Sequence, residues 1–210
     1  MIWQSELESH LHLTAGWLCL DFANTNDMHA SDSPIESLHN YDGLLNWAET
    51  RGVLQPGQTR LLRDLADQAP EQAMQVYGQA IELREFLYRT FSALATDHGI
   101  KPVDLKPLNQ ALKSALPNMF LVQQEQGYTW EWDAQQLALD FVLWPISFSA
   151  AELLQKGELR RLGECADEAG CGWLFFDTTK NHSRRWCDMK DCGNRDKVRR
   201  YYQRQSLQTS

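Results

Sequence analysis

Four cysteines in the last part of the chain have the residue type and spacing to bind a metal ion. Cys165 and Cys171 form one pair, Cys187 and Cys192 form a second, and a short strand-like stretch separates the pairs. Thiolates arranged as two pairs supply the four ligands of a tetrahedral zinc site, which is closed and therefore structural. The alternatives are incidental buried thiols and a disulfide, and His182, between the pairs, could replace one thiolate.

The segment around and after these cysteines is strongly basic. Nine basic and three acidic side chains between residues 180 and 204 give it a net charge of +6, whereas the whole chain carries −8. This asymmetry indicates a polyanion-binding element attached to an acidic body, and nucleic acid is the commonest target of such a surface. The alternative is a solvated basic helix that only keeps a small module soluble.

A helix is predicted over residues 196–205, with Asn194 as its N-cap. Basic side chains on this helix and just before Cys187 are the candidates for contact with nucleic acid. These candidates are Arg184, Arg185, Arg195, Lys197, Arg199, Arg200 and Arg204. Some of the arginines could instead offset the negative charge that four thiolates leave around a zinc ion, with Arg195 the ambiguous case.

The sequence before the cysteines predicts a separate helical body over residues 1–157, with the zinc finger over 158–210. Apolar residues at helical spacing predict helices over 35–53, 58–67, 69–98, 103–115 and 135–148, the last kinked at Pro145. Alternating apolar residues predict a β-hairpin formed by strands 119–124 and 128–132. The expected fold class is α+β, mainly α, with a small antiparallel hairpin.

No apolar run approaches the length of about 18 residues that a membrane span needs. No segment at the N-terminus has the pattern of a secretion signal, so we expect a cytoplasmic protein. The chain also lacks a glycine-rich phosphate loop and a nucleophile elbow, and Cys19 lies in an apolar run typical of a protein core. The sequence therefore predicts a protein that is not an enzyme.

The C-terminal motifs resemble a known family. Cys192-Gly-Asn-Arg195 followed by Lys197 is similar to the signature of the CGNR zinc fingers, and the stretches from Cys171 to Asp177 and from Arg184 to Cys187 also fit. The resemblance implies a treble-clef-like finger that holds one zinc ion per chain. It assigns the ligands to Cys165, Cys171, Cys187 and Cys192, and it implies a transcription regulator.

The N-terminal run Leu20-Asp-Phe-Ala-Asn-Thr25 resembles the "LDFxNT" hallmark of the ABATE domain, which commonly precedes CGNR fingers. Leu83-Arg84-Glu85 is similar to another segment of that domain. The resemblance implies a sensory role for residues 1–157, and Asp21, Asn24 and Arg84 could orient a small polar effector. The same residues could instead cap a buried element and form a structural ion pair.

Two classes of function follow from these observations. The first is a DNA-binding transcription regulator, in which the body senses a small molecule and the finger contacts DNA. Because one finger presents little surface, a specific DNA site would need a homodimer. The alternative is a zinc-stabilised module that binds RNA or another protein. A steep salt dependence and a preference for particular duplexes would distinguish the first class from the second.

Overall fold

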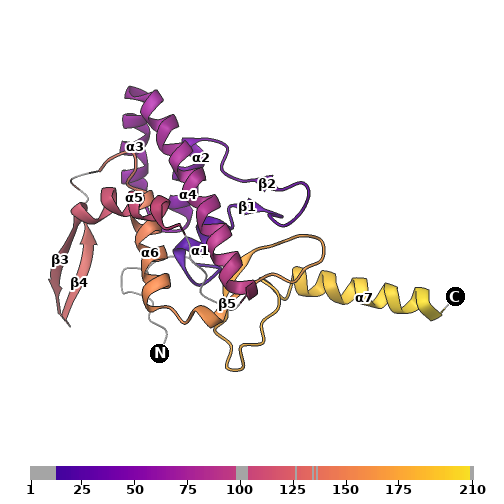
Figure 1. Cartoon of the computed structure of the whole chain (residues 1–210). Helices are drawn as coiled ribbons and strands as arrows, with labels where there is room; N and C mark the ends of the chain where they lie inside the picture. The colour runs from indigo at the N-terminus through magenta and orange to yellow at the C-terminus, as the bar shows by residue number, and fades with distance from the viewer. Residues whose placement is uncertain (1–12, 98–103, 126, 134, 136, 209–210) are drawn as a thin grey trace.

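Helices make up most of the described chain, which comprises residues 13–97, 104–125, 127–133, 135 and 137–208 of the computed structural model (Figure 1). Within these residues the helices are α1 (Leu18–Ala23), α2 (Tyr41–Thr50), α3 (Pro56–Gln68), α4 (Pro70–Asp97), α5 (Lys106–Ala115), α6 (Leu143–Lys156) and α7 (Cys192–Gln208). The antiparallel strand pairs are β1 (Asn26–Asp27) with β2 (Ile35–Glu36), β3 (Met119–Gln124) with β4 (Gly127–Trp132), and β5 (Leu162–Glu164) with β6 (Leu174–Phe176). This confirms the predicted α+β, mainly helical class.

Helix α1 lies in the core of the body, where each of its six residues is buried. Leu18, Leu20 and Phe22 belong to the main hydrophobic cluster, and α1 packs against both α4 and α6. Burying a side chain of this size contributes about 1.5–3 kcal/mol. Cys19 is fully buried in the same cluster, as predicted for a core residue. The position of α1 is therefore fixed by the two helices around it.

Helix α4 is the longest element and buries one stripe against the rest of the body. The fully or nearly fully buried members of this stripe are Ala80, Leu83, Leu87, Phe91 and Leu94. Their spacing of three and four residues is that of one face of an α-helix, as the sequence predicted. The predicted helix ends at His98 and Val103 lie outside the described residues.

The helix predicted over 35–53 is wrong at its beginning. Ile35 and Glu36 form strand β2, and helix α2 starts only at Tyr41. The reason is a cap, because Asn40 is extended and its side-chain oxygen accepts the N–H of Gly43 at 2.8 Å. Capping at residue 40 separates the strand from the helix.

The helix predicted over 135–148 is wrong at its beginning, because residues 137–142 are not helical, and the kink predicted at Pro145 is wrong as well. Helix α6 begins at Leu143, so Pro145 lies in its first turn, where the missing backbone N–H would have no partner within the helix. Beyond that turn α6 continues without interruption to Lys156. Gln136, which the sequence placed in this helix, lies outside the described residues.

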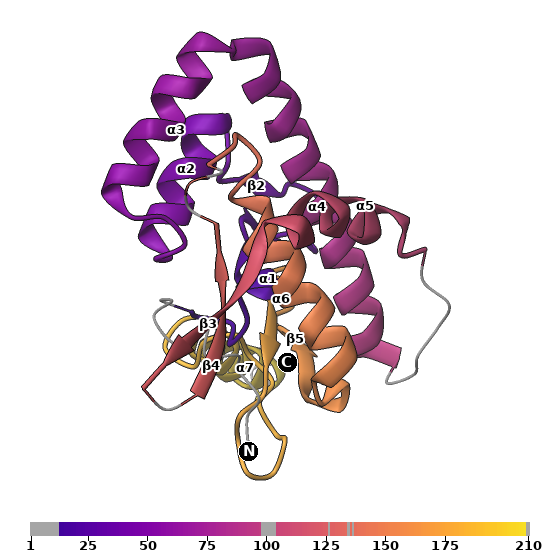
Figure 2. The same cartoon turned by 90° about the vertical axis from the view of Figure 1, so that its left-hand side faces the viewer.

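The β3–β4 hairpin lies at one edge of the molecule, with its tip pointing away from α2 and α3 (Figures 1 and 2). Its strands match the predicted hairpin, with Gln124 paired to Gly127 at the outer end and Met119 to Trp132 at the base. Trp132 anchors the base, because its ring lies 6.1 Å from that of Trp144 on α6.

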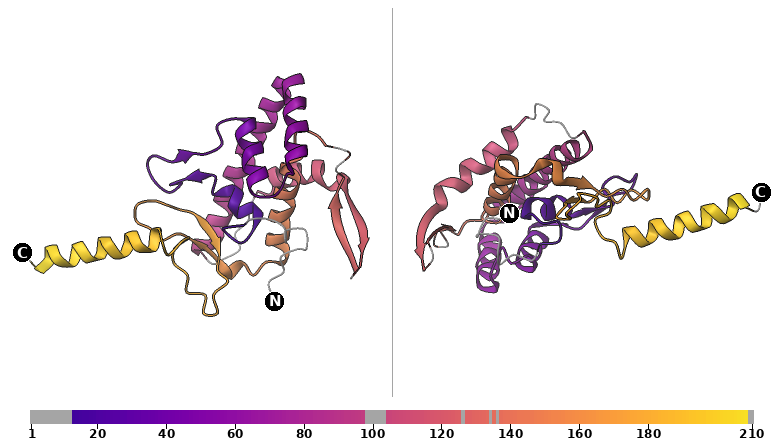
Figure 3. Two further views of the ribbon diagram at one scale, coloured as in Figure 1. Left: turned by 180° about the vertical axis from the view of Figure 1, so that it is seen from behind. Right: turned by 90° about the horizontal axis from the view of Figure 1, so that it is seen from below.

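The β5–β6 hairpin joins the C-terminal region to the body. Leu162, Leu174 and Phe176 belong to the same hydrophobic cluster as α1 and α4, so the hairpin shares the core of the body. Helix α7, in contrast, projects from the molecule on the side opposite to the β3–β4 hairpin (Figures 1 and 3). The C-terminal region therefore has one part packed on the body and one part extended into solvent.

Candidate metal centre and basic helix

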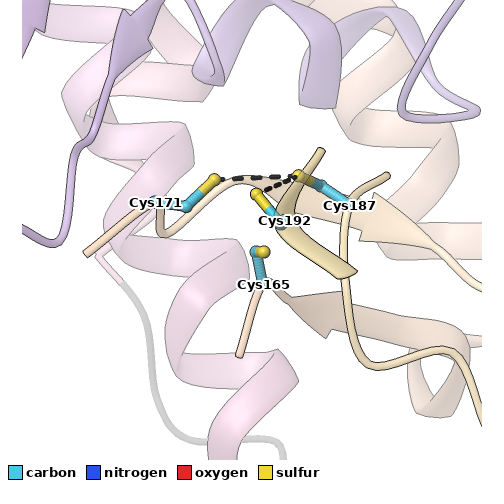
Figure 4. A group of neighbouring side chains, drawn as sticks. All are labelled: Cys165, Cys171, Cys187 and Cys192. Carbon is cyan, nitrogen blue, oxygen red and sulfur yellow. Dashed lines mark hydrogen bonds between the residues drawn. The ribbon is translucent and has the colours of Figure 1, made fainter. Parts of the chain in front are cut away.

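The four cysteines of the C-terminal region come from three segments that the fold brings together. Cys165 and Cys171 lie in the loop between β5 and β6, Cys187 lies in the loop after β6, and Cys192 is the first residue of α7. Figure 4 shows the four side chains turned toward a common centre. The arrangement thus combines a hairpin loop with the start of a helix.

The separations of the sulfur atoms are those of a tetrahedral metal site. All four lie within 4.8 Å of one another, with 3.7 Å between Cys171 and Cys187 and 3.6 Å between Cys187 and Cys192. Zn–S bonds of about 2.3 Å in a tetrahedron require S···S separations of about 3.8 Å, whereas a disulfide needs about 2.05 Å. None of the cysteines, all of which are described, forms a disulfide. The cluster therefore fits one structural zinc ion.

Without a cation, these four thiols would compete for ionisation. Hydrogen bonds from the thiols of Cys171 and Cys187 lower the pKa of Cys165. The pKa of Cys187 rises because its own thiol donates to Cys165 and Cys171, and burial raises the pKa of Cys192. A divalent cation at the centre would stabilise all four thiolates at once. A bound metal ion would therefore favour the fully ionised form of the cluster.

Two glycines allow the loop between β5 and β6 to lie directly on the body. Gly170 and Gly172 have φ angles of +88° and +66°, in the left-handed region that favours glycine. A Cβ atom at Gly170 would lie 2.7 Å from the Cβ of Ser31, and one at Gly172 would lie 2.7 Å from the hydroxyl oxygen of Tyr88. We call residues 165–173 the knuckle. Its close contact with the body depends on these glycines.

Helix α7 begins earlier than predicted. It starts at Cys192 rather than Asp196, and Asn194 lies in its first turn, where its side-chain amide donates to the carbonyl of Lys190 at 2.8 Å. The side chain of Asp188 instead accepts the N–H of Lys190 at 2.5 Å. The predicted cap at Asn194 is therefore wrong, and the last zinc ligand is itself part of the helix.

One side of α7 is fastened to the knuckle through Asp167, whose carboxylate is fully buried. Arg195 lies 2.9 Å from one oxygen of Asp167, and Arg199 lies 3.3 Å from the other. Arg195 also donates to the sulfur of Cys192 at 2.9 Å, and this bond raises the pKa of Arg195. Arg195 therefore braces the metal site and offsets thiolate charge, and Arg199 ties the helix to the knuckle.

Asp167 was not among the residues singled out from the sequence. The signal that could have found it is an acidic residue two positions after a zinc ligand, in a region that is followed by several arginines. Asp196, four positions after Cys192, is a second buried carboxylate in this region, and it pairs with Arg199 at 2.6 Å and with Arg200 at 2.8 Å.

The two arginines before Cys187 differ in their surroundings. Arg184 donates to the carbonyl oxygens of Trp186 and Cys187, and its guanidinium lies 4.4 Å from the centre of the Phe175 ring. These contacts support the loop that carries a zinc ligand. Arg185 is exposed, with its guanidinium 5.1 Å from the ring of Trp186. Arg185 is the more accessible of the two.

The opposite side of α7 presents Lys197, Arg200 and Arg204, which follow one another at spacings of three and four residues. All three are exposed. Within the described part of the chain, Lys197 and Arg204 make no ion pair, and Arg200 pairs only with Asp196 of its own helix. We call these three residues the outer face of α7.

Asp21 and Asn24, proposed as effector ligands, are both buried and bonded to backbone groups. Asp21 accepts the N–H groups of Thr14 and Ala15 at 2.9 and 3.1 Å. Burial raises the pKa of Asp21, although Arg51 and these N–H groups act in the opposite direction. Asn24 bonds to both the N–H and the carbonyl of Leu174, each at 2.8 Å. Both side chains therefore have structural partners.

Arg84, the third residue proposed for effector binding, is also engaged. Its guanidinium pairs with both oxygens of Glu36 at 2.7 Å and with Glu85 at 3.0 Å. These partners raise the pKa of Arg84 despite its burial, which acts to lower it. The contacts of Asp21, Asn24 and Arg84 are to separate partners, and a role of the three in effector binding stays a prediction.

A cluster of four thiolates beside a helical body, with a basic helix leading from the last ligand, defines a zinc-finger protein. Comparison with family models gives two matches. The ABATE model, described as "Putative stress-induced transcription regulator", matches residues 16–157, and the CGNR zinc finger model matches residues 161–205. The chain therefore belongs to the ABATE family and carries a CGNR zinc finger, as its motifs indicated. Neither is a family of enzymes. A search of curated proteins found no match.

Among the described residues, no helix combines the length and the apolar character needed to cross a membrane.

Proposed function

We propose that the chain is a transcription regulator whose zinc finger, residues 158–210, contacts DNA and whose body, residues 1–157, senses a small molecule. The observation that carries this proposal is the division of α7 into two sides. Arg195 and Arg199 fasten one side to the knuckle, while the outer face keeps its cations exposed. Two of these cations, Lys197 and Arg204, make no ion pair among the described residues, and exposed cations of this kind suit contact with phosphates.

The shape of α7 supports the same proposal. A helix of 17 residues is about 25 Å long, and α7 projects from the body with its far end in solvent (Figure 3). The major groove of DNA admits a single α-helix. Tyr201, which is 58% exposed and lies one helical turn after Lys197, could add apolar contacts to base edges. The zinc ion, held by four thiolates, would fix the helix and leave no coordination site for catalysis.

For the sensing role, the body offers a cleft of about 670 Å³ between α4, α5 and α6. Its lining includes two lysines and two acids, namely Lys106, Lys113, Glu82 and Asp140. A small molecule with both an anionic and a cationic group would suit this lining. Mass spectrometry of the protein under non-denaturing conditions would identify such a molecule if it co-purifies.

A site of four reduced thiolates also suits the cytoplasm, where thiols are kept reduced.

The test of DNA contact is the double variant Lys197→Glu/Arg204→Glu. Binding to a mixed-sequence duplex is measured by fluorescence anisotropy between 50 and 200 mM salt, a range in which phosphate contacts lose affinity steeply. We expect the variant to bind at least about tenfold more weakly at low salt, with a salt slope shallower by about two. Zinc content should stay unchanged, because neither residue contacts a ligand.

The matched control is Arg60→Glu/Arg89→Glu. Arg60 on α3 and Arg89 on α4 are exposed and make no ion pair within the described residues, so the control changes the net charge equally. It should bind DNA nearly as well as the parent. If both double variants lose affinity alike, attraction by net charge explains the binding. If neither does, α7 does not contact DNA, and the same anisotropy assay with a structured RNA tests the alternative module.

A further inference from the structure

We propose that Asn24 is a positioning residue that couples the body to the metal site. Its side-chain amide donates to the carbonyl oxygen of Leu174, and its side-chain oxygen accepts the N–H of the same residue, each at 2.8 Å. The two residues are 150 positions apart in the sequence, and both are buried. One side chain thus satisfies both backbone groups of a single residue of β6.

The hydrogen bonds of Asn24 satisfy backbone groups on the edge of β6 that does not face β5. In an antiparallel pair, the backbone groups of successive residues point alternately toward the partner strand and away from it. Since the N–H and carbonyl of Leu174 meet Asn24, they point away from β5. The N–H of Phe176, two residues further, likewise donates to the carbonyl of Ala15 at 2.8 Å. Asn24 and Ala15 together occupy the place of a third strand.

We call the contacts of Asn24 and Ala15 with β6 the joint. Asp21, which lies in α1, supports the joint by holding Ala15 in place. Its carboxylate holds the N–H of Ala15 at 3.1 Å, and the carbonyl of Ala15 holds Phe176. The ring of Trp17, one turn earlier, lies 6.0 Å from that of Phe176 in an edge-on arrangement. Trp17 and Asn24, which flank α1, therefore contact strand β6 directly, and Asp21 contacts it through Ala15.

Strand β6, which the joint holds, is close in sequence to two of the metal ligands. Leu174 lies three residues after Cys171, and it pairs across the hairpin with Glu164, which precedes Cys165. The N–H of Cys165 also donates to the carbonyl of Trp173 at 2.9 Å. Because α1 is packed between α4 and α6, a displacement of α1 would move β6 and two of the four thiolates. Through Asp21 and Asn24, the position of α1 in the body thus determines the position of Cys165 and Cys171.

This inference goes beyond the proposed function, because it concerns metal retention and does not depend on DNA. The first test uses the zinc-loaded parent protein and amide hydrogen exchange measured by NMR. We expect the N–H groups of Leu174 and Phe176 to exchange as slowly as those of α1, since the joint opens only when the body opens. Exchange of Leu174 far faster than that of Phe22 in α1 would overturn the proposal.

The second test is Asn24→Ala, which leaves both backbone groups of Leu174 without their partner. We expect zinc to transfer to a chromogenic chelator about tenfold faster at 20 °C, well below the temperature at which the helical signal of the body is lost. The cobalt-substituted variant should also show an altered thiolate absorption band. A purely structural role in the body would lower the melting temperature without changing either metal readout.

Asn46→Ala is the matched control, because Asn46 is an exposed asparagine on α2 whose side chain contacts Asp42 and Arg63 and not the finger. It should release zinc at the parent rate. A folded Asn24→Ala variant with the parent's release rate and cobalt spectrum would refute the coupling. If Asn24→Ala does not fold, the amide exchange rates of Leu174 and Phe22 in the parent protein decide whether the coupling exists.

Discussion

The polar groups of α1 and those of α7 differ in where their partners lie. Asp21 in α1 and Asn24 directly after it are buried, and backbone groups of the same chain satisfy them. In α7, Lys197 and Arg204 are exposed, and the described residues offer them no ion pair. A buried polar group must be paired within the fold, whereas exposed cations remain available to another molecule. Asp21 and Asn24 are therefore suited to position the zinc finger, whereas Lys197 and Arg204 are suited to contact another molecule.

Among the changes that test this comparison, loss of the zinc ion should have the largest effect. Structural zinc contributes on the order of 10 kcal/mol to the folding of small domains, so Cys192→Ser should abolish zinc binding and unfold α7. The body should keep its helical signal and its cooperative unfolding, because its core does not include the ligands. Elemental analysis and circular dichroism measure the two effects.

Cys19→Ala is the control for this change, since Cys19 is buried in the body and outside the cluster. It should retain one zinc ion per chain. Retention of a full equivalent of zinc by Cys192→Ser, or loss of the whole helical signal, would contradict the separation between the metal site and the body.

A smaller effect is expected from Asp167→Asn, which removes the charge that fastens α7 to the knuckle. Arg195 and Arg199 lose an ion-pair partner, so the amides in the first turns of α7 should exchange about tenfold faster. Zinc content should be unchanged, because Asp167 is not a ligand. Unchanged exchange in α7 would show that the thiolates alone fix the helix.

The smallest effect concerns Glu36, the partner of Arg84. Burial acts to raise the pKa of Glu36, but hydrogen bonds from Arg84 and from the N–H of Leu38 outweigh it and hold the pKa below 4.5. Because the folded pKa is lowered, the stability that this pair contributes is complete above pH 4.5 and is lost as the pH falls through the folded value.

Glu36→Gln should therefore destabilise the body by about 1 kcal/mol at pH 7, a figure reduced by screening because Glu36 is 35% exposed. The difference in the free energy of unfolding from the parent should be smaller in acid, for example at a pH of about 3, than at pH 7. Urea unfolding at both pH values measures it. A difference that grows on acidification would show that the pair does not stabilise the fold.

The sequence predicted the parts of the molecule that follow from local patterns. Cys165, Cys171, Cys187 and Cys192 meet as their pairing indicated, and the stripe of α4 has the expected spacing. The start of α2 was missed because the cap at Asn40 outweighed the apolar pattern before it. Such local competition is decided by a single hydrogen bond.

Long-range pairing explains why the partners of Asn24 and Asp167 were not predicted. The partners of Asn24 and Asp167 are set by tertiary structure, since Leu174 is 150 residues from Asn24 and Arg199 is 32 residues from Asp167. No periodicity in the sequence carries such information. Arg195, in contrast, was recognised as ambiguous from its place beside a ligand, and its contacts with Cys192 and Asp167 assign it to the metal site.

The central claim is that the outer face of α7 contacts DNA while the joint around Asn24 serves the fold. NMR titration of the zinc-loaded protein with a short mixed-sequence duplex tests it most directly. The account predicts shift changes at Lys197, Arg200 and Arg204 that diminish as salt is added, and unchanged signals for Asn24 and Leu174. Changes confined to the body, or none along α7, would contradict it.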